Sequence, residues 1–327
     1  MTGRAIRPRN GRSCTISQID RSRCTCWGLI VSLPNSEPEH PSRIVDRYLS
    51  RYNIEPNLGQ NFLIDPFPIR TSIQAASDLG LNNDSHVLEI GPGPGVLSVE
   101  LLRLGSKITA IEISQNACDF LESELNHEGL NLFNEDALSI QWPDTITHVV
   151  ANIPYGISSP ILERIQEHHR SNPLMGISLL VQREFAHRMV MKSIPKDRGP
   201  LGIALWLDFE CKLISDVPPS SFRPQPDVYS SIVTLRPVSR IELQDVSRKL
   251  VRRISSWCFG RRRRKMRTSL RDIPRGILKI GKWSSSDWLR ILDNLENEGG
   301  NLRGFMDKRP EELTPEQWTS ICRIIAR

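Results

Sequence analysis

The sequence predicts an α/β fold, in which helices cover a parallel sheet and a smaller all-helical domain follows. Strand and helix signals alternate between residues 86 and 191, which is the pattern of a parallel sheet buried on both faces. A glycine-rich turn, residues 91–95, follows the first of these strands and leads straight into a helical pattern. After Pro237 the strand signals stop, and the 327 residues are enough for two domains.

Residues 1–41 predict a disordered extension. They contain six arginines against three acids and four prolines, without sustained periodicity. The first 33 residues hold one acid, Asp20, so an organelle transit peptide and a misassigned start codon both remain open. The two expected domains are 42–237 and 238–327.

Each element has its own signal. Residues 43–52 predict a short helix, and Asp65 is expected to cap a second helix that starts at Pro66. The strands of the sheet are expected at 86–90, 107–113, 130–134, 147–151 and 175–181. Helices are expected between them at 95–104, 114–125, 158–169 and 183–191.

Two further strands, 203–216 and 230–236, have no helix signal between them and are expected to form an antiparallel hairpin. The second domain is expected to contain short helices at 242–258, 261–272, 286–294 and 315–326. The last of these starts with a capping box at Thr314, with proline at the first helical position.

The glycine turn indicates the kind of ligand. Gly91 and Gly93 leave room for a ligand to lie against the backbone, but Val96 stands where a dinucleotide fingerprint has its third glycine. Pro92 and Pro94 remove two N–H groups that a pyrophosphate would use. The turn therefore predicts a nucleoside-type ligand without a buried phosphate, and S-adenosylmethionine fits that description.

Glu112 ends the next expected strand and lies 21 residues after Gly91. In α/β nucleotide sites a carboxylate about 20 residues beyond the first glycine accepts hydrogen bonds from ribose hydroxyls. The spacing predicts this role for Glu112, against the alternative of a solvated carboxylate at the end of a strand.

The segment Asn152-Ile153-Pro154-Tyr155, also at a strand end, predicts chemistry on a nucleobase. The exocyclic amino nitrogen of a base is a poor nucleophile, because its lone pair is delocalised into the ring. The Asn152 side-chain oxygen and the Ile153 carbonyl, held extended by Pro154, could each accept one amino proton. The Tyr155 ring would stack on the base.

Positive charge is concentrated in one region. Residues 248–282 contain fourteen Lys and Arg residues against one acid, a local charge of +13; since the whole chain is +6, the remainder sums to −7. This asymmetry predicts a nucleic-acid footprint, against the alternative of a solvated helix face. The predicted phosphate-binding residues are Arg261, Arg262, Arg263, Arg264, Lys265 and Arg267.

Other features bound the function. No apolar run approaches the length of a membrane span. The seven scattered cysteines predict reduced thiols in the cytoplasm, or in an organelle if residues 1–33 are a transit peptide. Cys24-x-Cys26 has no second cluster, so no metal site is expected.

Eight segments together resemble the rRNA adenine N6-dimethyltransferase family, and the resemblance runs from about residue 57 to residue 322. These segments are 57–65, 89–93, 135–138, 152–155, 182–188, 217–228, 262–265 and 309–313. The resemblance implies a Rossmann-like, S-adenosylmethionine-dependent methyltransferase sheet. It also implies two methyl transfers to N6 of each of two adjacent adenosines near the 3′ end of small-subunit rRNA. The substrate would be rRNA in a pre-30S-type particle, and we expect a monomer.

The resemblance also assigns residues. It places Asn61, Leu63, Gly91, Glu112, Asp136 and Asn152 around the cofactor. Asp136 would lie at the cofactor's adenine, although by itself it is typical of a turn or cap residue. Phe222 is similar to the family's loop aromatic near the target base, although the sequence by itself favours a core Phe. The N-terminal extension has no counterpart in the family.

Three alternatives remain. A large-subunit rRNA adenine methylase shares the Asn-x-Pro-Tyr chemistry, but segments 217–228 and 309–313 favour the small-subunit branch. A DNA adenine methylase would also share it, but no separate sequence-reading domain is evident. A ribosome-assembly or transcription factor could keep the fold without catalysis, but the intact site segments argue against it.

Overall fold

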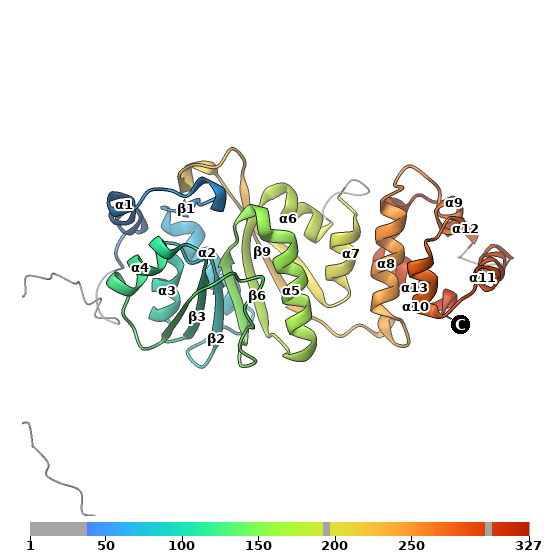
Figure 1. The fold of residues 1–327 in the computed structure, drawn as a ribbon, viewed down its shortest axis with the longest axis horizontal. Coiled ribbons are helices and arrows are strands. Elements are labelled where there is room, and N and C mark those ends of the chain that lie inside the picture. Colours follow the sequence, from blue (N-terminus) through green and yellow to red (C-terminus); the bar gives the residue numbers. More distant parts are fainter. Residues whose placement is uncertain (1–37, 192–196, 298–302, 327) are drawn as a thin grey trace, which may run out of the picture.

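The computed structural model describes residues 38–191, 197–297 and 303–326, and within them a seven-stranded sheet forms the centre of the first domain (Figure 1). The strand order is β4-β3-β2-β5-β6-β9-β7. The strands are β2 (His86–Ile90), β3 (Lys107–Glu112), β4 (Leu130–Asn134), β5 (His148–Asn152), β6 (Gly176–Gln182), β7 (Phe209–Val217) and β9 (Ser230–Pro237). Strands β2 to β6 pair in parallel, while β9 is antiparallel to β6 and β7. The expected parallel sheet is confirmed.

Alternate residues of the strands enter two separate hydrophobic cores, one on each face of the sheet. In β5, Val150 packs into one core while Val149 and Ala151 pack into the other. Because successive side chains of a strand point to opposite faces, this division requires helices on both sides. One face is covered by α1 (Pro41–Arg51), α2 (Pro66–Ser77), α3 (Val96–Arg103) and α4 (Gln115–Glu124). The other is covered by α5 (Ser158–Ser171), α6 (Arg183–Val190) and α7 (Pro200–Trp206).

Local capping confirms two of the expected helix starts. The Asp65 carboxylate accepts a hydrogen bond from the Phe67 N–H at 2.9 Å, with Pro66 in the first helical position of α2. At the other end of the chain, Thr314 and Gln317 form the reciprocal bonds of the predicted capping box, at 3.3 and 3.1 Å.

The predicted strand 203–216 is wrong in its first part. Residues 200–206 form helix α7, and β7 starts at Phe209. Pro200 stands at the first helical position, and Ile203 and Leu205 enter two different cores on two sides of the helix. A short apolar run fits either period, so the choice depends on packing that the sequence does not display.

The expected antiparallel pair is confirmed for β7 and β9, but the connection is not a simple hairpin. Between them the chain forms a 3₁₀ turn, η3 (Pro219–Ser221), and a two-residue strand, β8 (Phe222–Arg223). Strand β8 pairs antiparallel with β1 (Phe62–Leu63), next to the turn η1 (Pro56–Leu58). The proline-rich loop therefore returns to the start of the domain.

The described part of the second domain is all-helical, as predicted. It contains η4 (Ile241–Leu243), α8 (Arg248–Phe259), α9 (Met266–Arg271), α10 (Arg275–Gly281), α11 (Ser285–Asn297), α12 (Arg303–Met306), η5 (Pro310–Glu312) and α13 (Pro315–Ile325). These helices share a third hydrophobic core around the fully buried Trp318. Figure 1 shows them gathered at the end of the molecule opposite α1.

The predicted helix 261–272 is only half correct. Residues 261–264 form a turn, closed by a bond of 2.8 Å from the Arg264 N–H to the Arg261 carbonyl, and α9 starts at Met266. Helix α8 ends at Phe259 with Gly260 as its C-cap, and glycine is a poor helix former at this point. The arginines therefore lie on a turn rather than on the expected helix face.

Side-chain contacts, as well as the chain itself, connect the two domains. Ile203 and Leu207 from the α7 region pack into the third core, so this core extends across the predicted boundary at residue 237. Asp208, 5% exposed, accepts hydrogen bonds from Gln166 of α5 at 2.8 Å and from Arg252 of α8 at 2.7 Å. It also lies 3.2 Å from the Arg248 guanidinium.

Some predictions lie outside the described residues. Residues 1–37 of the predicted extension 1–41 are among them, while Pro41, its last residue, already belongs to α1, with His40 as the N-cap. Among the described residues no helix combines the length and apolarity that a membrane crossing requires.

Candidate active site

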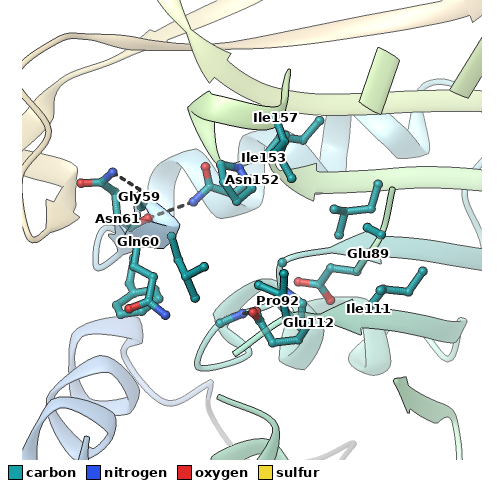
Figure 2. Close-up of a pocket in the computed structure, with 18 of the residues that line it drawn as sticks. Gly59, Gln60, Asn61, Glu89, Pro92, Ile111, Glu112, Asn152, Ile153 and Ile157 are labelled. Carbon is teal, nitrogen blue, oxygen red and sulfur yellow. Dashed lines mark hydrogen bonds between the residues drawn. The ribbon is translucent and has the colours of Figure 1, made fainter. Parts of the chain in front are cut away.

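A cavity of about 390 Å³ opens at the carboxyl ends of β2, β3 and β5. This volume falls within the range of small-molecule sites, roughly 300–1,000 Å³. Its walls come from five segments, 56–63, 89–94, 111–113, 135–138 and 152–157, with Val96 and Leu97 at the start of α3. In Figure 2, Glu89 and Glu112 lie on one side of the cavity, and Asn61 and Asn152 lie on the other.

The structure brings together most of the residues predicted for a site. Every residue predicted to bind the cofactor lines the cavity, and so do the four residues of the Asn152–Tyr155 segment. The predicted cofactor residues are Asn61, Leu63, Gly91, Gly93, Glu112, Asp136 and Asn152.

The glycine turn requires glycine for steric reasons. Gly93 has a φ of 55°, and a Cβ there would lie 2.8 Å from Cε1 of Phe62. Gly95 has a φ of 82°, and a Cβ there would lie 2.5 Å from Cδ2 of Leu121. Positive φ values and contacts this short exclude an L-side chain without movement of the neighbours. The turn can thus carry its backbone along the wall of the cavity.

Glu112 connects the glycine turn to the start of α4. Its Oε2 accepts a hydrogen bond from the Gly93 N–H at 3.0 Å, and its Oε1 accepts one from the Ser114 N–H at 2.9 Å. Burial raises the pKa of Glu112, while these backbone donors oppose the shift. Each carboxylate oxygen retains a lone pair for a further donor in the cavity.

Glu89 is a cavity residue to which the sequence prediction gave no individual role. It lies inside β2, is 1% exposed, and accepts a hydrogen bond of 2.6 Å from Ser98 Oγ. Burial raises the pKa of Glu89 to about 8; the Ser98 bond opposes this shift, and the Glu112 charge adds to it. At neutral pH Glu89 is therefore mainly protonated. A carboxylic acid in the apolar strand Val87-Leu88-Glu89-Ile90 was the signal available in the sequence.

Asp136 is both a turn residue and a wall of the cavity. Its Oδ1 accepts a hydrogen bond from the Leu138 N–H at 2.8 Å, and its Oδ2 accepts one from Ser139 Oγ at 3.3 Å. These bonds hold the carboxylate beside Leu138, which also lines the cavity. The two interpretations of Asp136 from the sequence are therefore compatible.

Asn152 is oriented by a residue from another segment of the cavity wall. Its Nδ2 donates a hydrogen bond of 3.1 Å to the backbone carbonyl of Asn61 (Figure 2). Because a carbonyl can only accept, the amide nitrogen must face Asn61. Among the hydrogen bonds of the described residues, none uses Asn152 Oδ1 or the Ile153 carbonyl as an acceptor.

Tyr155 is held by a residue that the sequence prediction missed. Its hydroxyl lies 2.6 Å from Ser230 Oγ, at the start of β9. Ser230 is fully buried, and burial raises the pKa of Tyr155. The two residues are 75 positions apart, and no signal in the sequence links them.

Phe222 is not brought to the cavity with Asn152 and Tyr155. It is 1% exposed and belongs to the core beneath α1 and α2. Strand β8 pairs Phe222 with Leu63, and of these two residues only Leu63 lines the cavity. The loop folds back onto β1, so this arrangement gives no support to the predicted role of Phe222 beside the target base.

The predicted RNA-binding residues lie in the second domain, and four of the six have acidic partners. Lys265 and Arg267 contact Asp307 at 3.1 and 2.6 Å, and Arg264 lies 3.4 Å from Asp272. Arg262 forms an ion pair with Glu311. Arg261 stacks on the Trp257 ring, and Arg263 is exposed. We call residues 261–267 the arginine run. This run carries less unpaired positive charge than the sequence indicates.

Comparison with known proteins agrees with this geometry. A model of the family described as ribosomal RNA adenine dimethylase matches residues 51–289. Two curated relatives are each named probable ribosomal RNA small subunit methyltransferase A. The one from Thermococcus gammatolerans is 31% identical over 269 residues, covering 82% of this chain and 88% of the relative. The one from Pyrococcus furiosus is 32% identical over 274 residues, covering 83% and 92%.

A solved structure extends the likeness to three dimensions. The crystal structure of a dimethyladenosine transferase from Plasmodium falciparum superposes with a TM-score of 0.66 at 25% identity. The match covers 79% of this chain and 95% of that one. With a family match over most of its length and a cavity built from the expected segments, the chain belongs to the ribosomal RNA adenine dimethylase family.

Proposed function

We propose that this protein transfers methyl groups from S-adenosylmethionine to N6 of adenines in small-subunit rRNA, twice on each of two adjacent adenosines near the 3′ end. One observation carries the proposal: the Asn152–Tyr155 segment and the Gly91–Glu112 pair form walls of a single cavity. A cofactor and a target base could thus meet in one site. The names of the curated relatives support small-subunit rRNA as the substrate.

The residues of the cavity fit the proposed cofactor. Glu112 would accept hydrogen bonds from the ribose hydroxyls, since its carboxylate is buried and fixed by two backbone donors. Asp136 would accept from the amino group of the cofactor's adenine, with Leu138 against the ring. Asn61, Leu63 and the Gly91–Gly93 backbone would complete the walls. When bound, S-adenosylmethionine supplies an electrophilic methyl group.

The Asn152–Tyr155 segment would orient the target adenine. Asn152 Oδ1 and the Ile153 carbonyl would each accept one N–H of the exocyclic amine, which favours the tetrahedral geometry of a nucleophilic nitrogen. The hydrogen bond to Asn61 holds the Asn152 amide in the required orientation. Tyr155, fixed through Ser230, would present its ring to the base. The leaving amino proton would pass to water.

The second domain would hold the RNA. Residues 248–282 carry a local charge of +13, and phosphate contacts supply much of the affinity of nucleic-acid-binding proteins. Arg261, Arg262, Arg263, Arg264, Lys265 and Arg267 are the proposed contacts. When these residues bind phosphates, their ion pairs with Asp307, Glu311 and Asp272 would have to break.

The test is methyl transfer by the purified full-length protein from labelled S-adenosylmethionine to unmethylated small-subunit particles, with large-subunit particles in parallel. Mass spectrometry of the digested rRNA should find N6,N6-dimethyladenosine in the small-subunit rRNA at two adjacent positions. Modification confined to large-subunit rRNA would contradict the proposed substrate. A protein that binds S-adenosylmethionine but modifies neither RNA would instead be the non-catalytic alternative.

A further inference from the structure

The second domain contains a basic hollow that is separate from most of the predicted RNA-binding residues. It lies between α8 and α10 and has a volume of about 580 Å³. We define the α8–α10 groove by Lys249, Arg253, Trp257, Arg261 and Lys279, which all line it. Both helices are labelled in Figure 1, at the end of the molecule opposite α1.

Three of these residues share one face of α8. Lys249, Arg253 and Trp257 are four residues apart along the helix, and residues at this spacing stack above one another. Arg261 lies just beyond the end of α8, in the turn 261–264, and stacks on the Trp257 ring. Lys279 of α10 faces this stripe across the groove.

The groove contains no acid. None of its lining residues is Asp or Glu, and its four cations form no ion pair with any acid among the described residues. Lys249, Arg253 and Lys279 are exposed. Arg262, Arg264, Lys265 and Arg267 of the arginine run, by contrast, each have an acidic partner. Within the described residues, the groove therefore brings together four cations that have no acidic partner.

One cation of the groove is already held in place. The Arg261 guanidinium lies 3.3 Å from the centroid of the Trp257 ring, and the Trp257 indole N–H donates a hydrogen bond of 2.9 Å to the Ser269 carbonyl. Stacking on a fixed ring reduces the side-chain entropy that binding would otherwise remove. An arginine fixed in this way matches the planar, bidentate recognition of phosphate.

We propose that the α8–α10 groove binds the phosphate backbone of the substrate rRNA, with Lys249, Arg253, Arg261 and Lys279 as the phosphate contacts. This inference rests on the proposed function. Three of the four residues lie outside the arginine run, and Arg261 connects the groove to it. Charge complementarity favours RNA: an open, acid-free groove with cations on both sides fits a polyanion of regular charge spacing.

The experiment compares rRNA binding of the full-length protein and three triple variants across a salt series, with unmethylated small-subunit rRNA as the probe. The first is Lys249→Gln/Arg253→Gln/Lys279→Gln, which spares the arginine run. A matched control, Arg70→Gln/Lys107→Gln/Lys212→Gln, removes three exposed cations from the first domain. The third, Lys249→Arg/Arg253→Lys/Lys279→Arg, keeps the charge.

The groove variant should bind rRNA more weakly. The slope of its log binding constant against log salt concentration should be about two units less steep, since each phosphate that is no longer neutralised reduces the slope by roughly 0.7–0.9. KM for small-subunit particles should rise while kcat and S-adenosylmethionine affinity stay unchanged, because docking contacts act equally in the ground and transition states. The control and the charge-conserving variant should keep the wild-type slope.

Three results would overturn the inference. One is a wild-type slope in the groove variant; another is an equal loss in the control, which would indicate a general effect of net charge. Weaker binding to particles with unchanged binding to free rRNA would point to a ribosomal protein as the occupant and would also reject it. Failure of the proposed function is a different outcome, namely a wild-type protein that modifies no small-subunit adenine.

Discussion

The Asn152 side chain donates a hydrogen bond of 3.1 Å to the backbone carbonyl of Asn61, although the two residues are 91 positions apart. This contact fixes which end of the amide faces the cavity wall. It also links the segment before the first sheet strand to the strand end that carries the Asn-Ile-Pro-Tyr sequence. The predicted adenine-binding oxygen is thus positioned by the segment that is predicted to surround the cofactor.

We expect Asn152→Ala and Tyr155→Ala to lower kcat by orders of magnitude while S-adenosylmethionine affinity changes by less than about tenfold. Both side chains would act on the target adenine in the transition state, so the loss belongs to the chemical step. Single-turnover assays and calorimetry separate the two quantities. Ser230→Ala is the matched positioning variant: it frees the Tyr155 hydroxyl and should cost less than Tyr155→Ala. Wild-type turnover by Tyr155→Ala would exclude the stacking role.

Glu112→Ala should weaken S-adenosylmethionine binding by roughly ten- to a hundredfold, since a hydrogen bond to a charged group contributes about 1.5–3 kcal/mol. The variant also loses the bonds to Gly93 and Ser114, so some loss of thermal stability is expected. Glu112→Gln, which keeps one acceptor oxygen, should recover part of the S-adenosylmethionine affinity and part of the thermal stability. Calorimetry on the folded variants provides the measurement, and unchanged affinity in Glu112→Ala would remove Glu112 from the site.

Glu89 predicts a specific dependence of stability on pH. Its folded-state pKa of about 8 lies above the ordinary value of 4.5, so the folded state holds the proton more tightly than the unfolded state. The resulting stabilisation is complete below pH 4.5 and is lost as pH rises toward 8. At about 1.4 kcal/mol per pH unit, the total is on the order of 5 kcal/mol.

Glu89→Gln should remove this loss of folding stability with rising pH. Denaturant unfolding of both proteins from pH 4.5 to 8.5 should therefore show the variant gaining stability relative to wild type as pH rises. Glu163→Gln, at an exposed position on α5, serves as the control, and its free energy of unfolding should change with pH as that of the wild type does. A constant difference between Glu89→Gln and wild type would contradict the buried, protonated state.

Neutralising Arg261, Arg262, Arg263 and Arg264 together should weaken rRNA binding and flatten its salt dependence, by up to about 0.7–0.9 slope units for each phosphate that these arginines bind. Arg262 and Arg264 should account for less of this change than Arg261 and Arg263, because they already have acidic partners. Binding of S-adenosylmethionine should be unaffected. An unchanged slope across the salt series would assign these arginines to solvation of the turn.

Asp208→Ala should destabilise the protein by about 3–5 kcal/mol, because it leaves the partly buried Arg252 without its partner at the junction of the domains. The matched control is Glu210→Ala, two residues away. It removes an exposed ion pair with Arg236 and should cost less than about 1 kcal/mol. Chemical denaturation measures both, and equal effects would contradict the junction role of Asp208.

The sequence by itself determined most strands of the sheet, the glycine turn and the cavity walls at the ends of β2, β3 and β5. Short apolar strand runs, glycine at positive-φ positions and proline next to caps are local features, so they are visible in local sequence. Glu112 and the Asn152–Tyr155 segment could be found because parallel strands carry their carboxyl ends to one edge. The family resemblance contributed Asn61, Leu63 and Asp136, which no local pattern indicates.

Only the tertiary structure decided the features that depend on contacts between distant segments. Residues 200–206 became helical because their apolar side chains enter two cores, which a short apolar run cannot reveal. Ser230 next to Tyr155, and the acids at 307 and 311 next to the arginine run, depend on how the chain folds back. The same holds for burial, which raises the pKa of Glu89 and keeps Phe222 in the core: it depends on the surroundings from all sides, and a linear sequence records only neighbours along the chain.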